Sequence, residues 1–95
     1  MLTANNWNVC QYAALLVMMA KASGLEAGEL VHVIADAHIY DRHIDIVKRL
    51  IEKKPYPAPK MRVEDITDFY KFTKDSFTAE NYQYHEFNEK IPVAI

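Results

Sequence analysis

The stretch of sequence that decides the fold is WNVCQYAALLVMMAKA, residues 7–22, which is dense in alanine, leucine and methionine. These residue types favour a helix, and Ser23-Gly24 behind them is a typical helix stop. Good N-cap types stand at or just before its start: Thr3, Asn5 and Asn6. We therefore predict a helix from about residue 6 to residue 22.

This predicted helix has almost no polar side. From residue 12 to residue 20 its polar atoms are confined to the hydroxyl of Tyr12. A helix that is apolar all round is normally buried all round. A chain of 95 residues is too short to cover such a helix, because small domains bury only about 60–65% of their unfolded surface. We expect a structural unit larger than this chain, or an apolar face that meets a partner.

The composition excludes several classes of protein. The chain is 51% hydrophobic and 25% charged, which excludes intrinsic disorder. Its net charge of −2 is not that of a nucleic-acid-binding protein. The longest apolar run, residues 13–20, is shorter than the roughly 20 residues that span a bilayer, and the N-terminus lacks the basic region of a signal peptide. With a lone cysteine, Cys10, we expect a cytoplasmic protein with no membrane or nucleic-acid partner.

Residues 30–40, LVHVIADAHIY, alternate between apolar and polar side chains. A period of two predicts a strand whose apolar face lies on a core. The apolar face carries Val31, Val33, Ala35, Ala37 and Ile39. The opposite face carries His32, Ile34, Asp36, His38 and Tyr40. Two histidines, an aspartate and a tyrosine are unusual on a solvated strand, so this face is a candidate pocket wall.

The remaining elements are shorter. Asp41 is placed to cap a second helix over about residues 42–53, which the proline-rich connector at residues 55–59 ends. Residues 60–63 predict a short strand. Two aromatic-rich stretches predict short strands or turns: residues 66–72 and 77–84. The fold class is therefore α+β, with a long buried helix, a sheet strand, a second helix and short C-terminal strands.

Three polar side chains are candidates for ligand binding. The amide of Asn8, in the first turn of the long helix, has donors and acceptors that can pair both edges of an imide or amide; the alternative is a capping role. His38 and Tyr40 can share a sugar hydroxyl; the alternative is a histidine and a half-buried tyrosine of ordinary packing. The apolar tail, residues 91–95, either frays or closes over a pocket as a lid.

Metal binding and cysteine chemistry are the alternatives that the spacing disfavours. Along a strand, His32, Asp36, His38 and His43 would be spread over about 13 Å or more, whereas a metal site needs three ligands around one ion. We therefore expect no metal. Cys10 lies in the apolar helix with no histidine at i±3 or i±4, which favours a structural thiol over a nucleophile.

Several motifs, in order from end to end of the chain, resemble thymidylate synthase. They are WNVCQYA (7–13), GLEAGEL (24–30), DAHIY (36–40) and PVAI (92–95). The matching region is roughly the C-terminal third of that enzyme. The resemblance implies that residues 1–95 are the C-terminal part of a single thymidylate synthase domain, not a complete domain, in an α+β homodimer whose long helix is buried.

The resemblance also implies a reaction and roles for the candidate residues. The family methylates dUMP reductively to dTMP, with methylene-tetrahydrofolate as carbon donor and reductant. Asn8 would read the pyrimidine through O4 and N3–H, and His38 and Tyr40 would bind the 3′-hydroxyl of the deoxyribose. The tail would fold over the folate. Folate contacts are expected at Trp7, Val93, Ala94 and Ile95.

The family's nucleophile is a cysteine in a Pro-Cys-His segment, which this sequence lacks, and Cys10 does not correspond to it. Without that thiolate the covalent reaction has no first step, so we expect the isolated chain to be inactive. It would contribute dUMP contacts and the closing tail to a site completed by a missing N-terminal part, and we expect it to be a homo-oligomer. The alternative is a non-catalytic interaction module that derives from the same fold and self-associates through exposed core residues.

Overall fold

The long helix predicted from the sequence is present as α1 (Asn5–Ala22) in the computed structural model, which describes residues 2–93. Its N-cap residue is Ala4, and no side chain in the described part of the chain caps the first turn. The predicted N-capping is therefore wrong. Asn5 lies inside the helix, where its Oδ1 accepts a hydrogen bond of 3.3 Å from Nε2 of His32.

The C-terminal end of α1 has the hydrogen bonds of a Schellman motif. The N–H of Gly24 donates to the carbonyl of Lys21 at 3.2 Å, and the N–H of Leu25 donates to the carbonyl of Ala20 at 2.8 Å. Gly24 has a φ of 69°, in the left-handed region that side chains with a Cβ disfavour. The predicted helix stop is confirmed.

An antiparallel hairpin of β1 (Lys60–Val63) and β2 (Phe77–Glu80) lies beside α1. Its register pairs Lys60 with Glu80 and Val63 with Phe77. The strand predicted over residues 60–63 is confirmed. The two aromatic-rich stretches contain a 3-10 turn (Phe69–Lys71) and β2, respectively.

The second helix is shorter than predicted. A 3-10 turn (Asp41–His43) leads into α2 (Ile44–Ile51), which ends two residues before the predicted limit. The capping role predicted for Asp41 is wrong: Tyr40 precedes the 3-10 turn, and neither it nor His43, the N-cap of α2, makes a side-chain cap bond in the described structure. Within residues 2–93, Ile46 of α2, at 7% exposure, is the one hydrophobic residue that is buried.

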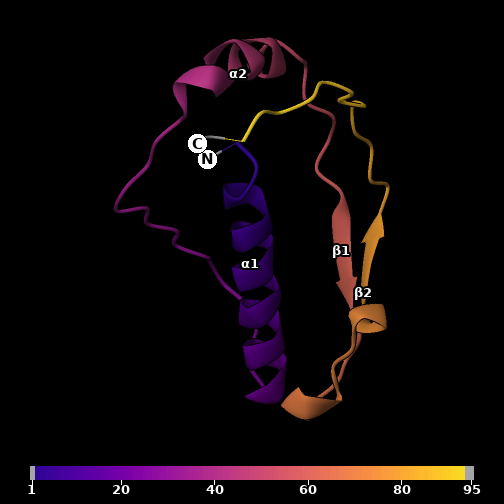
Figure 1. The fold of residues 1–95 in the computed structure, drawn as a ribbon. Helices are drawn as coiled ribbons and strands as arrows, with labels where there is room; N and C mark the ends of the chain where they lie inside the picture. Colours follow the sequence, from indigo (N-terminus) through magenta and orange to yellow (C-terminus); the bar gives the residue numbers. More distant parts are fainter. Residues whose placement is uncertain (1, 94–95) are drawn as a thin grey trace.

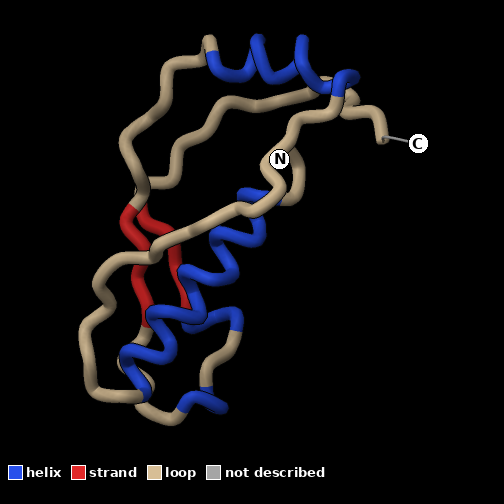
Figure 2. Tube along the Cα trace, turned by 90° about the vertical axis from the view of Figure 1, so that its left-hand side faces the viewer, coloured by secondary structure: helices blue, strands red, loops and turns tan. Residues whose placement is uncertain are grey.

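The strand predicted over residues 30–40 is absent from the described structure, where this segment is a loop with a bend at residues 35–36. The loop lies on the side of α1 away from the hairpin (Figures 1 and 2). Val31 and Val33, which the alternation places on a core, are 79% and 83% exposed. A strand needs a neighbour for its backbone hydrogen bonds, and the one described sheet consists of β1 and β2 alone.

The elements form an open frame. Figure 1 shows α1 and the hairpin side by side, with α2 across the end where α1 begins. The surface area is 8364 Å², against about 5,600 Å² for a compact protein of this mass, and the radius of gyration is 16.5 Å, against about 12 Å. No helix in the described part of the chain has the length and apolar character to cross a membrane.

The long helix is not buried within this chain, in agreement with the expectation that 95 residues are too few to cover it. Over its full length, which lies within the described residues, α1 has no buried residue. Tyr12 and Met19 are each 52% exposed and Leu15 is 42% exposed. The hairpin lies along one side of the helix (Figure 1), and the exposed side chains show that the remaining residues are too few to cover the rest.

The conformation of Gly24 gives a first testable prediction. An added Cβ would meet nothing within 4 Å at either Gly24 or Gly28, but only Gly24 has a positive φ. We expect Gly24→Ala to lower the free energy of unfolding by about 1–2 kcal/mol through backbone strain alone. Urea unfolding followed by far-UV circular dichroism measures this. Gly28→Ala is the matched control, and an equal loss in both variants would contradict the assignment.

Candidate functional site

Two of the segments predicted to carry the site, the one with Tyr40 and the C-terminal tail, meet at one pocket of about 290 Å³. The chain after β2 returns along α2 toward the N-terminal end of α1 (Figures 1 and 2). There it encloses the pocket together with residues before α1 and before α2. The lining residues are Thr3, Tyr40, His43, Ile91, Pro92 and Val93.

Three aromatic rings form a row at this pocket. The centroids of His38 and Tyr40 are 5.4 Å apart, and those of Tyr40 and His43 are 5.3 Å apart. Nδ1 of His38 donates to the carbonyl of Asp36 at 3.0 Å, a bond that assigns the proton of the neutral ring to Nδ1 and leaves Nε2 as an acceptor. The two neighbouring rings therefore offer an acceptor nitrogen and a phenol hydroxyl, a donor and acceptor set that fits a sugar hydroxyl.

His38 and Tyr40 are accessible to a ligand. The side chain of His38 is 51% exposed and Tyr40 is 46% exposed. The predicted adjacency of the two residues is present, although a loop and not a strand carries them. The site is thus open to water on this side.

The predicted base-reading and folate-side residues of α1 lie outside the pocket. Asn8 is exposed in the first turn of the helix, where its backbone N–H donates to the carbonyl of Ala4 at 3.1 Å. Trp7 is 81% exposed. Of the predicted tail contacts, Val93 lines the pocket, whereas Ala94 and Ile95 lie outside the described residues.

His43 is the site residue that sequence reasoning missed, since it was considered only as a metal ligand. It is 5% exposed, and its Nε2–H donates to the carbonyl of Pro92 at 2.7 Å. The side chain of His32 is hydrogen-bonded to Asn5, and that of His38 to the backbone of Asp36. These histidines therefore do not form a metal site with His43. No group of three potential ligands that could hold a metal ion occurs among the described residues.

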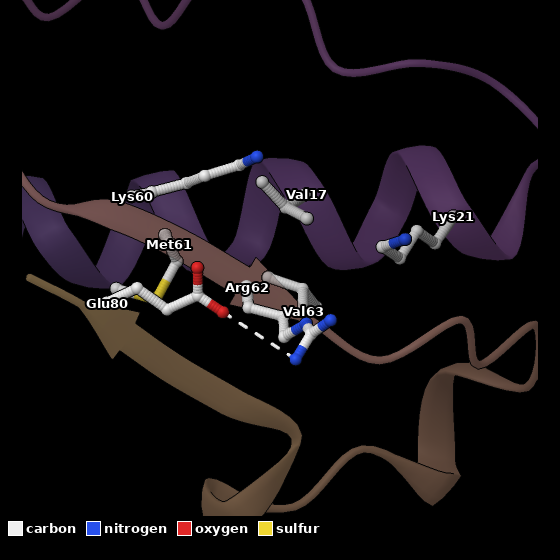
Figure 3. A pocket seen from close by; sticks show the side chains of 7 residues that line it. All are labelled: Val17, Lys21, Lys60, Met61, Arg62, Val63 and Glu80. Carbon is white, nitrogen blue, oxygen red and sulfur yellow. Dashed lines mark ion pairs between the residues drawn. The ribbon is translucent and has the colours of Figure 1, made fainter.

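A second hollow, of about 390 Å³, lies between α1 and β1 and contains none of the predicted site residues (Figure 3). It is lined by Val17, Lys21, Lys60, Met61, Arg62, Val63 and Glu80. Its charges are largely paired: Arg62 Nη1 lies 3.6 Å from Glu80 Oε1, and Lys21 Nζ lies 2.6 Å from Asp65 Oδ1. The Lys21–Asp65 pair joins the end of α1 to the loop after β1.

Comparison with known proteins shows the family and the fold to which the chain is similar. The sequence profile of the family described as "Thymidylate synthase" matches residues 1–95. A bifunctional dihydrofolate reductase-thymidylate synthase from Paramecium tetraurelia is 36% identical over 80 residues, which are 84% of this chain and 17% of that protein. The thermostable thymidylate synthase A from Bacillus subtilis superposes with a TM-score of 0.84 at 36% identity, over 98% of this chain and 33% of that one.

The structure is thus a segment of the thymidylate synthase fold, built from two helices and a two-stranded antiparallel sheet. The chain belongs to the thymidylate synthase family. It spans about one-third of the solved bacterial enzyme and 17% of the bifunctional relative.

The Lys21–Asp65 pair gives a prediction for pH dependence. The hydrogen bond and charge of Lys21 hold the pKa of Asp65 below its ordinary value. Because the pKa is lower in the folded than in the unfolded chain, the stabilisation is present above the unfolded pKa, about 4, and is lost as the pH falls through the folded pKa. Carboxyl NMR titration is expected to show the lowered pKa. It should persist in Lys21→Arg and disappear in Lys21→Met; an unchanged titration in Lys21→Met would refute the pairing.

Proposed function

We propose that residues 1–95 form the C-terminal part of a thymidylate synthase domain, and not a complete domain. The proposed reaction of the whole protein is the reductive methylation of dUMP to dTMP. The family match over residues 1–95 supports this, as does the superposition on one-third of a bacterial thymidylate synthase. The observation that carries the proposal is the pocket at which Tyr40 and the tail meet.

His38 and Tyr40 are proposed to bind the 3′-hydroxyl of the dUMP deoxyribose. Nε2 of His38 accepts a hydrogen bond from the hydroxyl, while the phenol of Tyr40 donates a hydrogen bond to the hydroxyl oxygen. The ring spacing of 5.4 Å and the exposure of both side chains support a shared ligand. A pocket of about 290 Å³ has room for a sugar but not for a whole nucleotide with folate, so other parts of the protein must complete the site.

Asn8 is proposed to read the pyrimidine. Its amide N–H donates to O4 and its carbonyl accepts from N3–H, a pairing that fits uracil and mismatches cytosine at both positions. The exposed position of Asn8 in the first turn of α1 leaves this amide free to meet a base.

The tail and Trp7 are proposed to contact methylene-tetrahydrofolate, which supplies the one-carbon group and the reducing equivalents when bound. Val93, Ala94 and Ile95 would cover the folate and exclude water from the reacting atoms. The exposed indole of Trp7 and the position of Val93 at the pocket support an apolar contact with a planar ring. No role for a metal is proposed.

The open surfaces of this chain are proposed to pack against the rest of the domain and a second subunit, in a cytoplasmic homo-oligomer. Two observations support this: α1 has unburied apolar side chains along its length, and the alternating residues 30–40 have no strand beside them in the described structure. Both features are expected if α1 and residues 30–40 become buried only when the rest of the domain or a second subunit packs against them.

Activity should therefore depend on the part of the domain that carries the Pro-Cys-His segment. We expect the purified 95-residue chain to form no dTMP from dUMP and methylene-tetrahydrofolate. A chimera should form dTMP if it joins this chain to the portion of the Bacillus subtilis enzyme that it does not match. Chromatographic detection of dTMP measures both.

The native Bacillus subtilis enzyme is the positive control for that assay. Turnover by the chain alone would refute the predicted inactivity. A folded but inactive chimera would favour the alternative, a non-catalytic module that self-associates through its exposed core, and sedimentation of the isolated chain would then show the self-association.

The role of Asn8 is testable in the active chimera. We expect Asn8→Leu to lower kcat/KM for dUMP about 10- to 100-fold, because the uracil edge loses two hydrogen bonds in a desolvated site, and to reduce the preference for dUMP over dCMP. Asn6→Leu, an exposed amide in the same turn, is the matched control. Equal effects of both substitutions, or an unchanged dUMP to dCMP ratio, would argue against base reading.

A further inference from the structure

One side of α2 and its lead-in turn contacts the C-terminal segment, residues 86–93, at successive points. Lys53 donates to the carbonyl of Glu86 at 3.4 Å, and its ammonium lies 5.1 Å from the ring centroid of Phe87. Arg49 forms an ion pair with Glu89. As residue numbers fall along the helix they rise along the segment, so the two run antiparallel.

The contacts end at two anchors beside the pocket. Nε2–H of His43 donates to the carbonyl of Pro92 at 2.7 Å, and Nη1 of Arg42 donates to the carbonyl of Val93 at 3.5 Å. His43 is 5% exposed, whereas the other contacts are at the surface. A hydrogen bond that is partly buried and of good length is harder to replace by water than the exposed ones, so His43 carries most of the positional constraint.

His43 also contacts the proposed sugar-binding side chains. Its ring centroid lies 5.3 Å from that of Tyr40, which in turn lies 5.4 Å from that of His38. Both Tyr40 and His43 line the pocket that Pro92 and Val93 close. One imidazole thus touches the tail on one side and the proposed sugar wall on the other.

We propose that His43 is a positioning residue that fixes the base of the C-terminal tail against the sugar-binding wall. It acts on the tail through its hydrogen bond to Pro92. The expected effect on folate binding rests on the proposed function, whereas the anchoring of the tail at Pro92 does not depend on it. With the tail base held at Pro92, the following residues have a fixed starting point from which to cover the folate.

The structural part is tested with trypsin, which cuts the bond between Lys90 and Ile91 only when the tail leaves α2. We expect His43→Leu, which removes the donor at similar volume, to raise the release of the 91–95 peptide about fivefold or more. His43→Gln keeps an N–H donor and should stay within about twofold of the unmodified chain. Mass spectrometry of the intact 95-residue chain measures both rates.

His85→Leu is the matched control, since His85 Nε2 likewise donates to a backbone carbonyl, that of Lys54, at 2.9 Å. It should leave the release rate unchanged. Cleavage after Arg49, inside α2, reports unfolding of the helix, so the ratio of tail release to this cleavage is compared between variants. We expect the ratio to rise in His43→Leu and to stay near that of the unmodified chain in His43→Gln. Equal ratios in the Leu and Gln variants, or no rise of the ratio in His43→Leu, would overturn the proposal.

The functional part uses the chimera with the Bacillus subtilis enzyme. We expect His43→Leu to raise KM for methylene-tetrahydrofolate about fivefold or more while KM for dUMP changes less than twofold, with recovery in His43→Gln. An inactive unmodified chimera would refute the proposed function and leave the proteolysis result to decide the anchoring. An active chimera with unchanged folate KM in His43→Leu would refute the role of His43 in positioning the tail for folate.

Discussion

The rest of this structure depends on one constraint: α1 has apolar side chains all round, and 95 residues cannot cover them. The hairpin lies along one side of the helix, and the loop before α2 leaves Tyr12, Leu15 and Met19 exposed. The large surface area and radius of gyration are the direct result. The stability of α1 in this chain must come mainly from its helix-forming residues and the Schellman end, because little burial contributes.

The sequence predicted those elements whose signals are local. The bounds of α1 follow from its composition and from the helix stop at Ser23-Gly24. The strand β1 was likewise predicted from the four residues that form it, 60–63. The alternation over residues 30–40 misled, because it describes which side chains share a face but does not supply a neighbouring strand. The pattern indicates that this segment can form a strand when another strand lies beside it, and in the described residues no strand does.

The candidate site was predictable to the extent that its residues lie close in sequence. His38 and Tyr40 are two positions apart and remain neighbours in a loop as they would in a strand. His43 could not be found in this way, because its burial and its bond come from Pro92, 49 residues away, and no periodicity connects the two. The resemblance to the family predicted a role for the tail but not the residues that hold it in place. Those residues lie on one side of α2 and its lead-in turn, and their contacts with the tail are far apart in sequence.

The anchors along α2 have a consequence for how the C-terminal segment can vary. At Glu86, Pro92 and Val93 the bonds are made to backbone carbonyls, which every residue type supplies. The identity of the side chain matters at Phe87, whose ring lies near the Lys53 ammonium, and at Glu89, through its pair with Arg49. The path of the tail is therefore encoded mainly by the helix that receives it. Tail side chains can be replaced to suit what they cover, while the route along α2 is kept.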